Sequence, residues 1–140
     1  MPFEIWLQLD ADSNILYGVT FTAQTEGQNE AYFDAVKAYA AELQEAYGDP
    51  VTVDGLSFYL TEFDSYPDAP KEGTGMRDTW AVEPEGELAD RMPLTFTQNG
   101  ESVEFANFYA IVSATFDERD GAETAECRIE YRVAPEGMHY

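Results

Sequence analysis

The sequence predicts an α+β fold: a mostly antiparallel β-sheet built from hairpins, with one amphipathic α-helix (about residues 29–47) packed on one face. Two patterns carry this prediction. Apolar and polar residues alternate along several segments, as in strands with one buried face, whereas residues 29–47 repeat apolar residues with a helical period. The length of 140 residues suits a single core. We therefore expect one acidic α+β domain over residues 1–140.

A hairpin is predicted at the start of the chain. Residues 3–9 alternate apolar and polar side chains, and the alternation resumes over residues 15–23. Between them, residues 10–14 are rich in turn formers. Their Asp-x-Asp-x-Asn pattern matches the first three ligand positions of an EF-hand calcium loop, but Ile15 stands where that loop requires Gly. We interpret the segment as a polar turn.

The helix over residues 29–47 has one apolar stripe, and acidic residues cover its other side. Asn29 is the expected N-cap. Gly48, followed by Asp49-Pro50, supplies the expected end of the helix. The apolar stripe consists of Tyr32, Phe33, Val36, Tyr39, Ala40, Leu43 and Tyr47.

Short strands are expected at residues 51–53 and 56–63, joined by an Asp54-Gly55 turn. Residues 64–91 form an irregular segment punctuated by Pro and Gly, with a short strand around residues 79–82. One helix covers only one face of a sheet. We therefore expect the irregular segment to fold over the second face; the alternative is an exposed aromatic patch.

Two further hairpins are predicted near the end of the chain. Strands at residues 94–98 and 102–105 are joined by Asn99-Gly100, a typical hairpin turn. Strands at residues 108–116 and 125–133 flank a turn at residues 117–121. Arg and Glu alternate on the outward side of this last hairpin, which favours cross-strand ion pairs.

The charge balance is the strongest functional signal. Twenty-eight Asp and Glu stand against seven Lys and Arg, a net charge of −21. Such a surplus opposes compaction by self-repulsion and steers association toward positively charged surfaces. The hydrophobic content of 44% is too high for a disordered acidic chain, so the acids are expected to coat a packed body. Direct binding to nucleic acid is disfavoured because phosphates would be repelled.

A cytoplasmic protein is expected, in its own cell or in a host cell. No apolar run approaches the roughly 18 residues that a membrane-spanning helix requires. The single cysteine cannot form an internal disulfide, which fits a reducing compartment. The first residues lack the basic start of a signal peptide.

No catalytic residue, metal site or cofactor is predicted. Glycine-rich phosphate loops are absent from the sequence, and with so many acids, close carboxylate pairs arise by chance. Cys127 and His139 are the only residues of their kinds. Cys127 falls on the apolar side of the last strand, where an unreactive buried thiol is expected, and His139 is the penultimate residue.

We interpret the acidic surface as a binding surface. Acids on a folded scaffold can imitate nucleic acid, which carries about one charge per 1.7 Å of duplex axis. The predicted function is a non-catalytic inhibitor or nucleic-acid mimic of the anti-defence, anti-CRISPR or immunity type. Its partner would be a basic protein: a nuclease, an effector complex or a toxin. The sequence leaves two alternatives open, a viral or phage structural protein and a generic domain adapted to high salt.

Three groups of acids are the candidate partner-binding residues. They come from the helix, from the irregular segment and from the last turn, and their role would be to pair with Lys and Arg of the partner. The candidates are Asp34, Glu42 and Glu45; Glu83, Glu85 and Glu87; and Asp117, Glu118 and Asp120.

Overall fold

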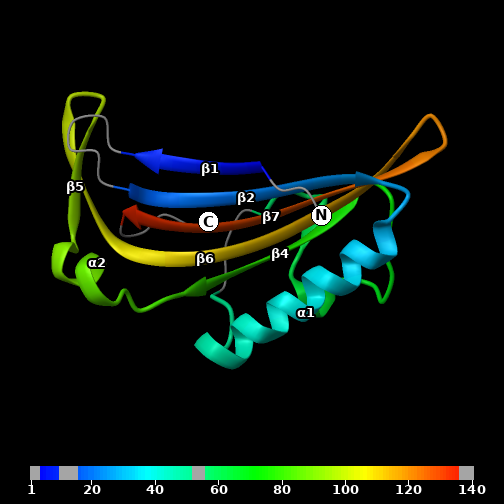
Figure 1. The fold of residues 1–140 in the computed structure, drawn as a ribbon, viewed down its shortest axis with the longest axis horizontal. Helices are drawn as coiled ribbons and strands as arrows, with labels where there is room; N and C mark the ends of the chain where they lie inside the picture. The colour runs from blue at the N-terminus through cyan, green and yellow to red at the C-terminus, as the bar shows by residue number, and fades with distance from the viewer. Residues whose placement is uncertain (1–3, 10–15, 52–55, 136–140) are drawn as a thin grey trace.

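The computed structural model describes residues 4–9, 16–51 and 56–135. Within these residues, seven strands form one sheet that is antiparallel except for one parallel pair, and the long helix α1 packs against one of its faces (Figure 1). The predicted α+β architecture is confirmed. The sheet order is β1-β2-β7-β6-β4-β3, with β5 paired to β6. The elements are β1 Glu4–Leu9, β2 Leu16–Glu26, α1 Asn29–Tyr47, β3 Leu60–Thr61, the 3-10 helix η1 Phe63–Ser65, β4 Thr74–Ala81, α2 Gly86–Arg91, β5 Leu94–Gln98, β6 Glu101–Arg119 and β7 Ala122–Pro135.

The β6–β7 hairpin is the centre of the sheet. Asp120 and Gly121 both have positive φ, 53° and 79°, which matches the two-residue turn that suits the twist of paired strands. The turn is therefore shorter than the predicted turn at residues 117–121, because pairing continues to Arg119 and resumes at Ala122. β6 is also one continuous strand, with a register shift between Phe105 and Asn107, rather than the two strands predicted.

The helix α1 begins and ends where the sequence predicts, at Asn29 and Tyr47. The N-cap prediction was wrong, because the N-cap is Gln28 and Asn29 is the first helical residue with a buried side chain. Gly48 follows the helix with φ of 84°, a conformation that glycine adopts readily. Of the predicted apolar stripe, Tyr39 is half-buried and Tyr47 is exposed, while the rest is buried.

The core lies between α1 and the sheet. Alternate residues of β4, β6 and β7 point toward the helix, so that Met76 faces Ala114, which in turn faces Cys127. Tyr39 of α1 and Tyr131 of β7 are joined by a hydrogen bond between their hydroxyl groups. A second, smaller cluster lies where β5 meets β6 and α2, around the ring contact of Phe96 with Phe105 at 4.8 Å.

Residues 64–91 do not cover the second face of the sheet, contrary to the sequence-based expectation. They supply β4, which pairs with β6 inside the sheet. Tyr66 packs on the α1 side, with ring centroids 5.8 Å from Phe33 and 6.1 Å from Phe116. The strand was underestimated because Asp78 interrupts the apolar series that Met76 and Trp80 would otherwise form. Hereafter we call the face opposite α1 the open face.

The region before η1 also departs from the sequence-based expectation. Of the strand predicted at residues 56–63, only Leu60 and Thr61 pair, in parallel with β4. Val51 donates its backbone N–H to the carbonyl of Thr79, 2.7 Å away. Residues 52–55 and the calcium-like turn at residues 10–14 lie outside the described residues.

Gly75 allows β3, β4 and β6 to approach closely, and we expect Gly75→Ala to destabilise the fold. An added Cβ would lie 2.5 Å from the carbonyl oxygen of Ala114, a backbone atom held by sheet pairing. Overpacking of this kind costs about 1–3 kcal/mol, measurable by urea unfolding. Gly18→Ala is the control, because the atoms closest to its Cβ belong to the flexible end of the Gln8 side chain. Equal losses in the two variants would contradict this account.

Candidate functional site

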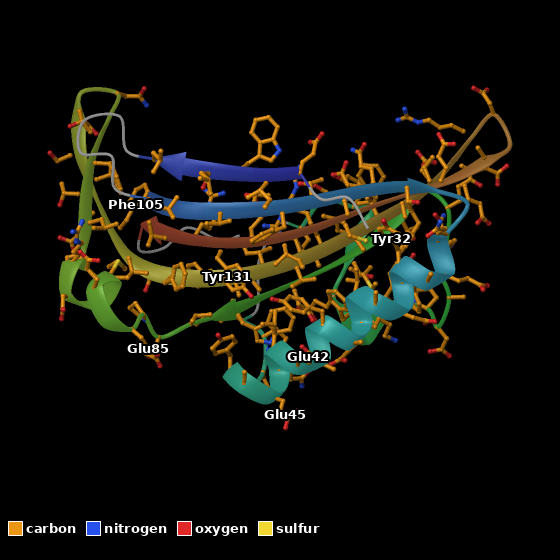
Figure 2. All side chains as sticks on the ribbon, in the orientation of Figure 1. Tyr32, Glu42, Glu45, Glu85, Phe105 and Tyr131 are labelled. Atoms are coloured by element: carbon orange, nitrogen blue, oxygen red, sulfur yellow. The ribbon has the colours of Figure 1, made fainter. Side chains whose placement is uncertain are left out.

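The nine candidate acids are all exposed, but they lie on three separate surfaces. Glu42 and Glu45 lie on the side of α1 away from the sheet, and Glu85 lies near α2, at the opposite end of the molecule from the β6–β7 turn (Figures 1 and 2). A 19-residue strand such as β6 spans roughly 60 Å, whereas a standard interface covers about 800 Å² of each partner. One compact partner surface therefore reaches only part of the set. The groups are Asp34, Glu42 and Glu45 on α1; Glu83, Glu85 and Glu87 around the start of α2; and Asp117, Glu118 and Asp120 at the hairpin.

Acids from three chain segments converge at the hairpin end, around a depression of about 130 Å³. The segments are the start of α1, the loop before β4 and the turn end of the β6–β7 hairpin. Backbone hydrogen bonds hold them together: Gly27 donates to the carbonyl of Glu123 at 2.8 Å, and Gly73 to that of Phe116 at 2.9 Å. We call the polar lining of this depression the acidic end; it comprises Asn29, Glu30, Glu72, Asp117, Glu118 and Glu123.

The charge of the acidic end is poorly compensated. Glu118 and Glu123 are direct cross-strand partners, an arrangement that destabilises an antiparallel pair. Within the described part of the chain, no Lys or Arg side chain lies within 4 Å of Glu30, Glu118 or Glu123. Asp117 has one such neighbour, the exposed Arg119 at 4.0 Å. These carboxylates are therefore available to an external cation.

The acids of α1 continue the negative surface away from the acidic end. Glu30, Asp34, Glu42 and Glu45 are all exposed, and at 100° per residue they fall within a stripe about 120° wide and roughly 22 Å long. Lys37, the cation of this helix, instead lies over the Phe33 ring, 5.2 Å from its centroid. The result is one acidic stripe that begins at the depression.

Sequence reasoning missed four members of the acidic end: Asn29, which was expected only as an N-cap, and Glu30, Glu72 and Glu123. Glu123 could have been found from the two-residue turn, since that turn places it opposite Glu118. Glu30 belongs to the acidic side of the helix that the sequence predicts, but nothing in the sequence distinguishes it from the other acids there. Nothing local in the sequence indicates Glu72, because its loop is brought to the hairpin by contacts distant in the chain.

The arginines gather on the open face. Arg77, Arg128 and Arg132 occupy positions of β4 and β7 that point away from α1. The predicted cross-strand ion pairs were wrong in detail: Arg128 pairs with Glu126 of its own strand at 3.7 Å. The reason is the register, which places Arg128 opposite Thr22 and Ser113 rather than opposite an acid. Cations thus offset acids on the open face but not along α1.

Asp78 is the one core carboxyl group among the described residues, on the side of β4 that faces α1. Burial raises the pKa of Asp78 to about 7, a hydrogen bond from the Phe63 backbone opposes this rise, and the nearby charges of Glu62 and Asp64 add to it. A carboxyl group titrating near neutrality is typical of catalytic sites as well as of strained cores. Asp78 lines neither the depression at the acidic end nor the open face, so we interpret it as a buried structural group.

The other residues considered for a reactive or metal-binding role give no sign of one in the described structure. Cys127 is buried, and burial raises the pKa of its thiol to about 12, which keeps it in the unreactive thiol form. His139 lies outside the described residues. Among the side chains that the structure describes, no group of three or more His, Cys, Asp or Glu is arranged to hold a metal ion.

Comparisons with known proteins identify no relative of this chain. No protein-family model matches this chain, and no curated protein or solved structure shows significant similarity to it. Of the two α-helices in the described ranges, neither has the combination of length and apolarity needed to cross a membrane.

We expect Asp78→Asn to change the pH dependence of stability. The folded pKa of about 7 lies above the ordinary value of 3.8, so the unfolded chain releases the proton first. The contribution of Asp78 to the free energy of unfolding is therefore fully present below about pH 4, and it is lost as the pH rises to about 7. The variant should be more stable than the wild type at pH 8 by on the order of 2 kcal/mol, with little difference at pH 4. Urea unfolding of both proteins across this pH range measures the difference in stability. Curves of stability against pH that run parallel for the two proteins would refute the prediction.

We expect Glu123→Lys to stabilise the protein, because it places an ammonium group opposite Glu118. Replacing a like-charge pair by an opposite pair is worth about 0.5–1 kcal/mol, and less at high salt. The control is Glu104→Lys, which changes the net charge equally but faces Thr95. Urea unfolding at low and high salt measures the stability of the two variants and shows whether they differ. Equal stabilisation by both variants would mean that only net charge matters.

Proposed function

We propose that this protein is a non-catalytic acidic binder that occupies the positively charged surface of a nucleic-acid-handling protein, as an inhibitor or nucleic-acid mimic. The observation that carries the proposal is the convergence of five carboxylates from three chain segments at the acidic end. A fold gains nothing in stability from placing Glu118 opposite Glu123. An external cation would turn that repulsion into attraction.

The acidic stripe on α1 extends the proposed binding surface. A rigid helix holds its carboxylates at fixed spacing, so the charges are positioned before the partner arrives. A contiguous negative field also accelerates encounter with a basic groove, and the acceleration falls steeply with added salt. Nucleic acid itself would be repelled by this surface. The proposed partner is therefore a basic protein such as a nuclease, an effector complex or a toxin.

We place the interaction in the cytoplasm, in the protein's own cell or in a host cell, which the single buried Cys127 supports. The proposal requires no cofactor and no metal. It assigns the main contacts to Asp117, Glu118 and Asp120 with Asp34, Glu42 and Glu45 in support. Glu85 and the helix α2, which carries Glu87, lie at the opposite end of the molecule from the β6–β7 turn (Figures 1 and 2), and Glu87 is already paired with Arg91 at 2.7 Å.

A grouped charge reversal tests this function. We expect Asp117→Lys with Glu118→Lys and Glu123→Lys to weaken binding to the native partner by at least about tenfold, because clustered like charges across an interface cost several kcal/mol. The partner is first isolated by affinity capture from the native host and identified, and its affinity for the pure protein is then measured by calorimetry at several salt concentrations.

The matched control reverses Glu83, Glu85 and Glu101, three exposed acids away from the acidic end. It changes the net charge equally and should weaken binding only about twofold. Equal losses in the two triple variants would remove the assignment to the acidic end. Recovery of no basic nucleic-acid-handling protein from the host would remove the proposed function.

A second candidate function, assembly into a larger particle, is favoured by the edge strand β1. Ile5, Trp6 and Leu7 are each at least 59% exposed on this strand, and β1 ends the sheet order. Exposed apolar edge strands are sites of strand pairing between chains. Defined oligomers in analytical ultracentrifugation would support assembly, and a strict monomer at high concentration would exclude it.

The alternative that the acidity is an adaptation to high salt has its own test. Full stability of the protein in dilute buffer would exclude it.

A further inference from the structure

We propose that β1 joins two copies of this chain, which pair edge to edge as an antiparallel dimer centred on Trp6. The dimer rests on the second candidate function, assembly through β1. It names the partner of that strand as a second copy and limits the assembly to two chains. It is independent of the acidic end and of the binding proposed there.

β1 exposes apolar side chains on both of its faces. Leu7 is in register with Val19 and Tyr131, so Leu7 and Ile5 point to the α1 side, whereas Trp6 points to the open face. All three side chains of β1 are at least 59% exposed. A partner packed on one face of the sheet would cover only one of these sets. A strand added at the edge contacts both, because its own side chains alternate between the same two faces.

The backbone of β1 is also suited to a further strand. β1 pairs with β2 along one edge and ends the sheet order, and in the part of the chain that the structure describes no strand pairs with its other edge. In Figure 1 this edge is the one farthest from α1. Natural edge strands are commonly protected by Lys or Pro, and β1 contains neither. Its outer N–H and C=O groups can therefore pair with a strand of another molecule.

The sequence of β1 is complementary to itself in one antiparallel register. Regular pairing with β2 covers Glu4–Gln8 and shifts at Leu9, so the regular run is centred on Trp6. With Trp6 opposite Trp6 of the second copy, Ile5 lies opposite Leu7 on the α1 side. Aromatic and aliphatic cross-strand pairs of this kind stabilise a sheet. Because both copies use the same surface, the contact closes at two chains.

Charge also favours this register. Two molecules that each carry −21 repel one another, so they can meet only where the contact itself is nearly uncharged. Glu4 is the one charged residue of β1, and the register places it opposite the neutral Gln8 rather than opposite Glu4 of the second copy. β1 points away from the β6–β7 turn (Figure 1). The antiparallel arrangement therefore puts the two acidic ends at opposite ends of the joined sheet.

The contact is small. Six residues of strand extend about 20 Å, which is less than a standard interface with about 800 Å² on each partner requires. We therefore expect a reversible dimer with a dissociation constant on the order of 0.1 mM. Added salt should strengthen the dimer by screening the repulsion between the two copies, whereas it weakens binding at the acidic end.

Sedimentation of the full chain at low and high salt tests the dimer. Wild-type protein should form dimers at high concentration, and more of them at high salt. Trp6→Glu places two carboxylates opposite each other and should raise the dissociation constant at least about tenfold. The matched control is Phe58→Glu, which also replaces an exposed aromatic residue by an acid. Because Phe58 lies just before β3, at the other end of the sheet order, this variant should change the constant less than about twofold.

Cysteine cross-linking tests the register. Residues directly opposite in an antiparallel pair have Cα atoms about 4.5–5.5 Å apart, within the range of a disulfide. Under a mild oxidant, Trp6→Cys should therefore give a cross-linked dimer. Glu4→Cys should not, because the two copies of residue 4 are offset by four residues, or about 13 Å. Both positions are exposed, and the native Cys127 is buried.

The possible outcomes separate this dimer from the proposed functions. Equal cross-linking through both positions would overturn the register centred on Trp6. Oligomers larger than two chains would overturn the closed dimer and leave assembly standing. A monomer at every concentration and salt would overturn both the dimer and assembly. The acidic binding function would then still stand, since the charge reversals at the acidic end test it separately.

Discussion

The pairing of β6 with β7 positions every other element of this protein. Its register brings Val112 beside Ile129 and Ala114 beside Cys127 on the α1 side, and it gives the outward positions to Ser113 and Arg128. β2 and β4 extend the sheet from the outer edges of this hairpin. The same register places Glu118 against Glu123. The core and the least compensated charges are thus two consequences of one set of backbone hydrogen bonds.

Charge is distributed unevenly because the two faces of the sheet have different neighbours. The α1 side is closed by aromatic and aliphatic packing, so the acids of the helix can only point outward. In the described part of the chain the open face has no helix, and Arg77, Arg128 and Arg132 lie on it beside acids. Most cations of the chain are used there or in local pairs such as Arg91 with Glu87. Among the described residues, the acids along α1 and most of those at the acidic end have no such partner.

The acidic end does not stabilise the fold, since Glu118 and Glu123 face each other across the strands; recognition of a partner is the role that we propose for it. Surface charges separated by more than about 8–10 Å are largely screened at physiological salt, so a diffuse excess of acid would give steering without specificity. In the binding that we propose, the short-range part would come from the five carboxylates that surround one small depression. Under this proposal, steering by the whole molecule and close contact at one site would be separable properties of the same surface.

Elements held by local interactions could be predicted from the sequence. Period and turn chemistry determine α1, the β1–β2 hairpin and the Asn99-Gly100 turn, whose positive φ values follow from its residues alone. Only the tertiary structure placed β4 next to β6, buried Asn29 and brought Glu72 to the hairpin, because these positions depend on contacts such as Gly73 with Phe116, distant in the chain. The sequence by itself determined how much negative charge the molecule carries. Where that charge converges was decided by long-range backbone pairing, which composition does not encode.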